Sequence, residues 1–229
     1  MKRPVISIII PAHNEEKYLG DTLRSLRAQT YPYFEVIVVA NGCTDGTVDV
    51  ARPHCDRVID LPERGLGKAR NTGAAKARGE LLVFLDADTS LERHALEEIA
   101  TQLSPQHSSA TLKGRPDRRK LSYSLLYVFK NLLHRFALHC GSSGVICCWR
   151  DQFKGVAGFD EALNVRENSD LIRRLARFGP YRFIGRAAAV TSMRRYERVG
   201  AARGAWEWLK IWAQSLTSDL HHRSYEAIR

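Results

Sequence analysis

Residues 5–15 read Val-Ile-Ser-Ile-Ile-Ile-Pro-Ala-His-Asn-Glu, a nearly continuous β-branched run that ends at a proline and then turns polar. Such a run is typical of a strand that is buried on both faces of a parallel sheet. A helix is expected next, because Asn14 can cap it and Leu19, Leu23 and Leu26 recur on one face. The stretch therefore predicts an α/β fold that opens with a buried strand followed by a helix.

The same alternation continues along the chain. Further strands are predicted at 34–40, 57–60 and 80–86, and further helices at 44–52 and 66–78. Alternation of this kind predicts right-handed crossovers, a mostly parallel twisted sheet flanked by helices, and a Rossmann-like ligand site at the carboxyl ends of the strands. Because Asn14, Asn41 and Asp86 each follow a strand, we expect these three segments to meet in one crevice.

Beyond residue 90 the pattern is less regular. It predicts a helix at 90–103, a basic stretch at 113–120, an apolar helix at 121–139, a strand at 145–150 and a helix at 168–178. A chain of 229 residues with 44% hydrophobic and 26% charged residues has the balance of a folded protein. We expect one sizeable domain and a tail.

The net charge of +10 favours anionic partners such as phosphorylated small molecules or anionic lipid. Nucleic acid is disfavoured, because the basic residues are scattered and no aromatic platform lies among them. Five cysteines at irregular spacing without a CxxC pair are typical of reduced thiols. With no secretion signal and no apolar run of about 20 residues, we predict a cytoplasmic protein, with a peripheral position at a membrane as the alternative.

The sequence Asp86-Ala87-Asp88 follows the predicted strand at 80–86 directly. Two carboxylates two residues apart can bind one hard divalent cation, Mg or Mn, together with the phosphates that it carries. A bound cation stabilises the negative charge of a departing diphosphate. The alternative is a solvated acidic turn.

Several segments, in this order, resemble the family 2 glycosyltransferases, which have the GT-A fold. They are Ser7–Glu15, Val38–Thr47, Lys68–Gly73 continuing through Phe84–Asp88, Gly155–Glu161 and Glu167–Leu171. The resemblance implies a catalytic domain at 1–200 that transfers a sugar from a UDP- or GDP-linked donor to an acceptor, with Mg or Mn and with inversion. The acceptor is not identified; a lipid-linked or polysaccharide acceptor is the class considered.

The resemblance also implies roles for individual residues. Pro11, Ala12 and Glu15 would line the nucleoside pocket, and Asn41 would face the base. Lys68 and Arg70 would lie near the base and diphosphate, Asp86 near the ribose and sugar, and Asp88 on the metal. The plainer alternatives are a helix cap for Asn14, a tight turn at Asn41-Gly42 and a solvated helix face for Lys68 and Arg70.

Two positions depart from the family pattern. Asn41 stands where an aspartate usually accepts a hydrogen bond from the base, so that uracil and guanine both remain open. Asn168 stands where an aspartate usually deprotonates the acceptor, and an amide cannot act as a base. Glu167 is our first choice of base and Asp170 the alternative, both near the start of a helix. A retaining mechanism or a weak enzyme also stays open.

The segment Thr191–Tyr196 resembles one that reaches over the active site in related transferases. Arg194 and Arg195 would clamp the diphosphate there, with a basic surface loop as the alternative. Residues 201–229 are predicted to be a helical tail that packs on the catalytic domain or on a second subunit of a homodimer. Its tryptophans make a membrane surface the alternative partner.

Three functions compete for these features. A metal-dependent hexosyltransferase explains the paired aspartates, the polar strand ends and the basic charge together. A catalytically degenerate module that only binds a nucleotide-sugar is the second, because of Asn41 and Asn168. Nucleotidyl transfer is the third, and it would need an early glycine-rich phosphate loop, which the sequence lacks before Gly42.

Overall fold

The computed structural model describes residues 5–136, 143–163 and 166–200, together with Arg203, Gly204, Trp206 and Lys210. The strands are β1 (Ile6–Ala12), β2 (Phe34–Asn41), β3 (Arg57–Leu61), β4 (Leu81–Leu85), β5 (Thr89–Leu91), β6 (Ser109–Pro116), β7 (Val145–Trp149) and β8 (Tyr181–Thr191). The α-helices are α1 (Leu19–Arg27), α2 (Thr47–Ala51), α3 (Leu66–Lys76), α4 (Ala95–Gln102), α5 (Leu121–Arg135), α6 (Arg150–Gly155), α7 (Glu167–Leu175) and α8 (Arg194–Val199). A 3-10 turn at Ala176–Phe178 follows α7.

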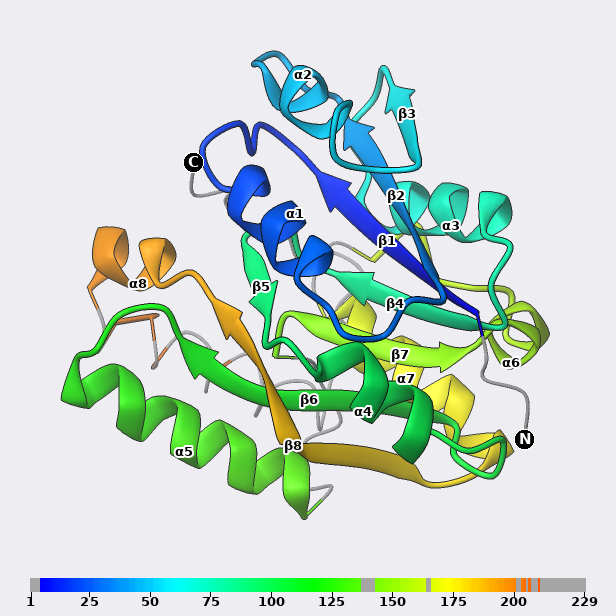
Figure 1. Cartoon of the computed structure of the whole chain (residues 1–229). Helices are drawn as coiled ribbons and strands as arrows, with labels where there is room; N and C mark the ends of the chain where they lie inside the picture. The colour runs from blue at the N-terminus through cyan, green and yellow to red at the C-terminus, as the bar shows by residue number, and fades with distance from the viewer. Residues whose placement is uncertain are drawn as a thin grey trace.

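The strands form one sheet in the order β3-β2-β1-β4-β7-β6-β8-β5 (Figure 1). Strands β3, β2, β1 and β4 run parallel, as do β6 and β8. Strand β7 is antiparallel to β4 and β6, and β5 is antiparallel to β8. The predicted α/β fold with a mostly parallel sheet is confirmed.

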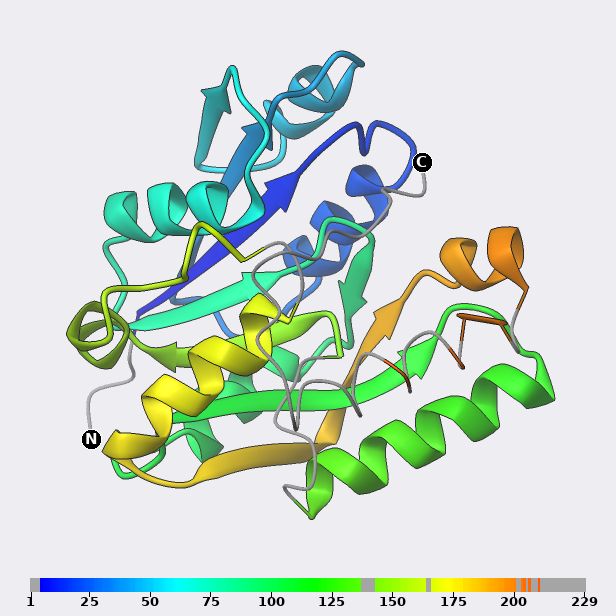
Figure 2. The same cartoon turned by 180° about the vertical axis from the view of Figure 1, so that it is seen from behind.

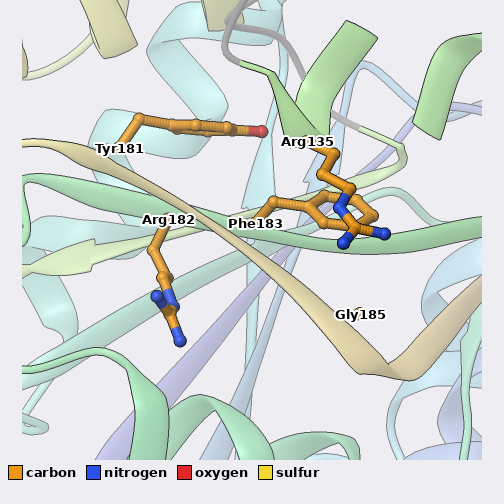
Figure 3. A pocket seen from close by; sticks show the side chains of 5 residues that line it. All are labelled: Arg135, Tyr181, Arg182, Phe183 and Gly185. Atoms are coloured by element: carbon orange, nitrogen blue, oxygen red, sulfur yellow. The ribbon is translucent and has the colours of Figure 1, made fainter. Parts of the chain in front are cut away.

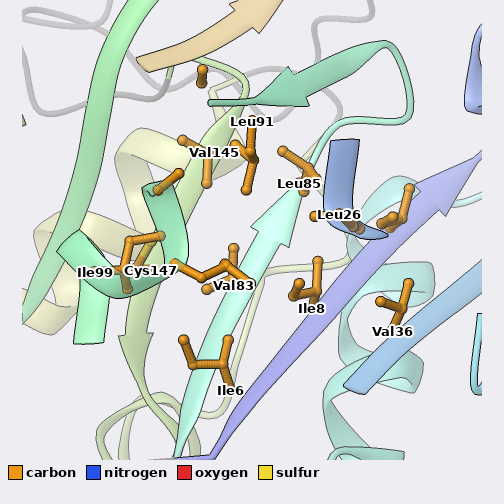
Figure 4. Close-up of a cluster of buried hydrophobic side chains, with 14 of the residues drawn as sticks. Ile6, Ile8, Leu26, Val36, Val83, Leu85, Leu91, Ile99, Val145 and Cys147 are labelled. Carbon is orange, nitrogen blue, oxygen red and sulfur yellow. The ribbon is translucent and has the colours of Figure 1, made fainter. Parts of the chain in front are cut away.

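Helices cover both faces of this sheet (Figures 1 and 2). Because strand side chains alternate between faces, Ile8 and Ile10 pack on one side with α1 and α4, whereas Ile9 packs on the other with α3 and α7. Figure 4 shows the first of these two clusters. On the second face, α3 approaches the sheet so closely that a Cβ at Gly73 would lie 2.4 Å from Ile9 Cγ2. The buried β-branched runs therefore hold the parallel half between two helical layers.

Helix α5 lies apart from these two clusters. Both views place it at the periphery of the molecule, alongside β6 and β8 (Figures 1 and 2). Tyr123 and Tyr127 of this helix form a small third cluster with Met193. The predicted helix at 121–139 is confirmed as far as Arg135, and residues 137–139 lie outside the described residues.

The structure corrects one prediction for the second half of the chain and adds two strands that the sequence did not reveal. Residues 90 and 91, placed in a helix, belong to β5, because Ser90 pairs with Val190 and Leu91 with Ala189 of β8; the helix begins only at Ala95. The basic stretch at 113–120 overlaps β6, and β8 was not predicted at all. These strands pair with partners up to about a hundred residues away, so local periodicity does not reveal them.

Asn14 does not cap α1. That helix begins at Leu19 after Tyr18, and Asn14 lies in the loop before it with a positive φ of 56°. The predicted tail at 201–229 lies almost wholly outside the described residues, so the division at residue 200 stays a prediction. In the part of the chain that is described, no helix combines the length and the apolarity that crossing a membrane requires.

Candidate active site

The loops after β1 and β2 are joined to each other at the carboxyl edge of the sheet. Asn14 Oδ1 accepts a hydrogen bond from Thr44 N at 2.8 Å, and Asn14 Nδ2 donates to Thr44 Oγ1 at 3.1 Å. Glu15 N donates to Thr47 Oγ1 at 2.8 Å. These contacts fix the start of the loop that presents the Glu15 carboxylate. Two of the three expected segments therefore meet where the sequence placed them.

Asn41 is buried at the end of β2. Its Oδ1 accepts a hydrogen bond from Gly65 N at 2.7 Å, just before α3, and its carbonyl oxygen accepts from His13 Nδ1 at 2.7 Å. The side chain therefore holds the loop before α3 in place. Lys68 in the first turn of α3 is exposed, with Nζ 3.5 Å from Glu63. Pro11 and Ala12 are buried at the end of β1.

Arg70 of α3 joins three segments beneath the crevice. It is only 3% exposed, and it donates to Glu167 Oε1 at 2.8 Å and to Asn168 Oδ1 at 2.9 Å, both on α7. A third hydrogen bond reaches Asp86 Oδ1 at 3.2 Å. The guanidinium also stacks over the ring of Phe159, 5.0 Å from its centroid. One arginine therefore positions two carboxylates from distant parts of the sequence.

Arg194 of α8 forms a second cluster on the other side of Asp86-Ala87-Asp88. It contacts both carboxylate oxygens of Glu15, one of them at 2.8 Å, and its Nε lies 3.1 Å from Asp88 Oδ2. Its guanidinium stacks over Tyr18 at 4.3 Å from the ring centroid. The planar fork of arginine suits such a bidentate pair. Arg194 therefore balances the charge of these two carboxylates.

Burial raises the pKa of three carboxyl groups in the crevice. Desolvation raises the pKa of Asp86 to about 6 although its side chain keeps 40% exposure, and Arg70 opposes that rise less strongly. Burial likewise raises the pKa of Asp88 to about 6 against the opposing charge of Arg194. The pKa of Glu15 is raised by burial too. A cation bound next to these carboxylates would therefore stabilise their ionised forms.

Asp170, the alternative base, lies in a different contact network. Its carboxylate accepts hydrogen bonds from Arg173 at 2.9 Å and from Arg174 at 2.8 Å. Arg174 in turn donates to the carbonyl oxygens of Val156 and Gly158, each at 2.6 Å. Asp170 thus ties α7 to the loop after α6. Arg195 is half-buried next to Arg194 at the start of α8.

The structure therefore brings together most of the charged residues that were singled out, namely Glu15, Arg70, Asp86, Asp88, Glu167 and Arg194. It does not join Asp170 to them. Three participants were missed: Tyr18, Phe159 and Asp117, whose Oδ1 accepts from Met193 N at 2.9 Å just before Arg194. Phe159 lies within a quoted segment, whereas nothing in the local sequence pointed to Tyr18 or Asp117.

The carboxylates suit a shared cation better than one held by protein alone. Within the described ranges, no group of three or more His, Cys, Asp or Glu side chains is placed to hold a metal ion. Asp86 and Asp88 supply the oxygen ligands that Mg and Mn prefer, and Mg usually completes its shell with water and substrate phosphates. The donor set therefore fits a cation that arrives with a diphosphate.

A separate hollow of about 460 Å³ lies at the far end of β8 (Figure 3), lined by Arg135, Tyr181, Arg182, Phe183 and Gly185. Tyr181 pairs with Ser109 at the start of β6, whereas the other end of β8 leads to Ser192, whose N donates to Asp88 O at 3.1 Å. The hollow is therefore distinct from the crevice.

The fold is similar to that of solved glycosyltransferases of the GT-A class. The chain belongs to glycosyl transferase family 2, whose family model matches residues 7–125, more than half of its length.

Individual relatives extend this comparison. The chain is 35% identical over 104 residues to the putative glycosyltransferase EpsH of Bacillus subtilis. The aligned region covers 43% of this chain and 30% of EpsH. S. aureus TarS 1-349, solved in complex with UDP-GlcNAc, matches with a TM-score of 0.67 and 21% identity over 82% of this chain and 58% of TarS. The mannosyltransferase PcManGT from Pyrobaculum calidifontis, solved with GDP-Man and Mn2+, matches with a TM-score of 0.69 and 21% identity. The match covers 83% of this chain and 57% of PcManGT. The match spans 30% of the length of EpsH, 20% of TarS of Staphylococcus aureus and 57% of an uncharacterized glycosyltransferase of Rickettsia typhi.

Proposed function

We propose that this chain is a metal-dependent glycosyltransferase that moves a hexose from a nucleoside-diphosphate donor to an acceptor hydroxyl. The observation that carries the proposal is the pairing of Asp86 and Asp88 with Arg70 and Arg194 at the carboxyl end of β4. Carboxylates for a cation and arginines for an anion lie at the strand ends, where open α/β sheets bind ligands.

The ligands bound in the similar structures support this donor class. TarS is described in complex with UDP-GlcNAc and PcManGT in complex with GDP-Man and Mn2+. At the predicted base-facing position, Asn41 has its Oδ1 engaged by Gly65 N, which leaves the amide nitrogen to face a base. Both uracil and guanine offer acceptors to such a donor, so the proposal covers UDP- and GDP-linked sugars.

We assign the cation, Mg or Mn, to Asp88 with Asp86, where it would neutralise charge on the leaving diphosphate. Pro11, Ala12 and Glu15 line the nucleoside side, with Lys68 at the mouth. Arg194 has to leave Asp88 when a cation binds there, and its fork can then hold a diphosphate oxygen. Arg195 stands beside it as a second cation.

We assign Glu167 as the base. Its carboxylate takes the proton from the acceptor hydroxyl, whose oxygen then bonds to the anomeric carbon as the bond from that carbon to the diphosphate oxygen breaks. Attack from the face opposite the leaving group inverts the anomeric centre. Glu167 is suited to this because Arg70 holds one carboxylate oxygen at 2.8 Å and orients the group. Asp170 is the weaker candidate, since both of its oxygens already contact arginines.

Calorimetric titration with UDP, GDP and their sugars, first with Mn and then with chelator, tests the proposal. Metal-dependent binding of one nucleotide is expected, and Asp88→Asn should weaken it at least about 100-fold by removing a ligand charge. Asp60→Asn is the matched control, because Asp60 is an exposed aspartate on β3. Binding that survives chelator and Asp88→Asn alike would remove the metal from the proposal.

The second candidate is a module that binds a nucleotide-sugar without turnover. It is favoured by Asn168, an amide that shares Arg70 with Glu167 at the position of the family's base. Single-turnover assays with several acceptors separate the two, because a module would bind the donor and release no transferred sugar with any of them.

A further inference from the structure

Helix α5 presents its more polar side to the protein. Tyr123, Tyr127 and His134 are buried, and Tyr127 and His134 lie beneath the helix toward β6 and β8. Asn131 on the same side accepts from Gly114 N at 2.8 Å and donates to Gly114 O at 2.9 Å. The helix is therefore held on the sheet by aromatic rings, an imidazole and an amide, together with the buried side chain of Leu133.

The opposite side of α5 is apolar and exposed, with Leu121 at 77% and Phe129 at 46% of their full accessible surface. At 3.6 residues per turn, the large apolar residues that are exposed on and directly after α5 fall within an arc of about 100°. We call this set the α5 face: Leu121, Leu125, Val128, Phe129, Leu132 and Phe136. A surface helix of a globular domain normally buries such a stripe, so the α5 face is built to be covered.

The charge around the α5 face is mainly positive, although Glu197 of α8 lies 3.7 Å from Arg118 and 3.9 Å from Lys120, both of which stay largely exposed. Helix α5 contains no aspartate or glutamate, and the exposed triplet Arg118-Arg119-Lys120 leads directly into it. Arg135 is exposed at its other end. From residue 109 to 136 the only acidic residue is Asp117. Whatever covers this face therefore meets apolar side chains bordered by cations.

This charge pattern distinguishes the candidate partners. A second copy of the chain would place two sets of cations opposite each other. Residues 201–229 carry four Lys and Arg against three Asp and Glu, so this segment offers little complementary charge. The interface of an anionic bilayer offers both an apolar layer for the stripe and negative headgroups for its border.

We propose that the α5 face, with Arg118, Arg119 and Lys120, docks on the surface of an anionic lipid bilayer. Leucine and phenylalanine side chains enter the boundary between headgroups and acyl chains, while the arginines and lysine bind the anionic headgroups. The helix lies in the plane of the membrane surface.

Docking would bring the crevice close to the bilayer. Helix α5 begins four residues after Asp117, which accepts from Met193 N next to Arg194, and Arg194 contacts Asp88. The start of the docked helix is thus linked by two short contacts to the proposed cation site. Resting on the proposed function, this assigns an acceptor that is carried by a lipid.

Co-sedimentation of the full chain with vesicles tests the surface without requiring turnover. Vesicles of phosphatidylcholine are compared with vesicles that contain roughly one third phosphatidylglycerol. Wild-type protein should pellet with the anionic vesicles only. The double variant Leu125→Asp/Phe129→Asp should bind them at least about tenfold more weakly, because two charges enter the apolar boundary.

Tyr33→Asp is the matched control, since Tyr33 is 51% exposed, close to the 46% of Phe129, and lies before β2 away from α5. It should pellet as wild type does. Arg119→Glu should weaken binding to the anionic vesicles by about tenfold through reversal of one charge. Equal pelleting of the double variant and wild type, or no pelleting of wild type, overturns the proposal.

Two further measurements keep the outcomes separate. Donor binding is titrated in solution with the same variants; loss of pelleting with wild-type donor affinity supports the surface, and pelleting without any donor binding would leave the surface standing while the proposed function fails. Analytical ultracentrifugation without lipid tests whether a second copy of the chain covers the α5 face instead. If the wild-type chain is a dimer and the double variant is a monomer, the α5 face is a subunit interface and the lipid proposal is overturned.

Discussion

Glu35 and Asp88 are acidic side chains at opposite ends of the parallel half of the sheet, Glu35 near the start of β2 and Asp88 in the turn after β4. Glu35, at the start of β2, accepts hydrogen bonds from Ser7 Oγ and Arg78 N, each at 2.6 Å, and from Arg78 Nε at 2.9 Å. Burial raises its pKa, but these donors outweigh burial and the net pKa is lowered. Burial dominates at Asp88, whose pKa rises to about 6.

The difference lies in where the partners come from. At the amino end, backbone and hydroxyl donors complete the shell of Glu35, so its charge is stabilised by the fold itself. At the carboxyl end, Asp88 depends on Arg194, a side chain from a segment more than a hundred residues later. We infer that Glu35 contributes to stability and Asp88 to ligand binding. The predictions below test this difference between the two ends of the sheet.

The largest effect is expected from Glu167→Gln. Transfer should fall by about 10²–10⁴-fold because the amide cannot take the acceptor proton, with donor affinity near wild type. Single-turnover kinetics and donor titration measure the two quantities. Asp170→Asn is the control on the same helix and should lower stability more than rate. A larger rate loss in Asp170→Asn than in Glu167→Gln would assign the base to Asp170.

Glu35→Gln should have the reverse profile. We expect a loss of about 1–3 kcal/mol in the free energy of unfolding, since an amide nitrogen would face buried donors, with donor binding kept. Urea denaturation at neutral pH measures it. Glu63→Gln is the control, because Glu63 is an exposed partner of Lys68 and should cost less than about 0.5 kcal/mol. Equal losses would show that Glu35 has no special part in stability.

The two ends should also differ in their response to pH. The raised pKa of Asp88 favours its protonated form in the folded state, so its stabilisation is present at low pH and is lost as pH rises through about 6. The lowered pKa of Glu35 has the opposite sign, and its stabilisation is lost as pH falls below its ordinary value.

Urea denaturation between pH 3 and pH 7, without divalent cations, checks both signs. Relative to wild type, Asp88→Asn should gain stability with rising pH by about 1–2 kcal/mol, and Glu35→Gln should lose it. Parallel pH profiles for the two variants would contradict the comparison.

The smallest effect is expected for Lys68→Ala. Lys68 is exposed at the mouth of the crevice, so removing one screened charge should weaken donor binding by no more than about threefold. Calorimetry at low and high salt measures it, and the difference should shrink at high salt. A loss as large as that of Asp88→Asn would place Lys68 in direct contact with the diphosphate.

Much of the first half of the fold could be predicted because its signals are local. The apolar runs of β1, β2 and β4 indicate burial on both faces, and the aspartates after β4 follow the strand directly. The second half could not be predicted in the same way. Strand β6 carries exposed Lys113 and Arg115, and β5 has three residues whose partners lie in β8.

The candidate site divides in the same manner. The amino-acid sequence by itself determined the α/β alternation, the place of the paired aspartates and the net positive charge, because residue type and period act over a few neighbours. Only the tertiary structure decided that Arg70 joins Asp86 to Glu167, that Arg194 joins Glu15 to Asp88, and that α5 carries its apolar stripe outward. These contacts depend on packing between segments far apart in the chain, which local periodicity does not encode.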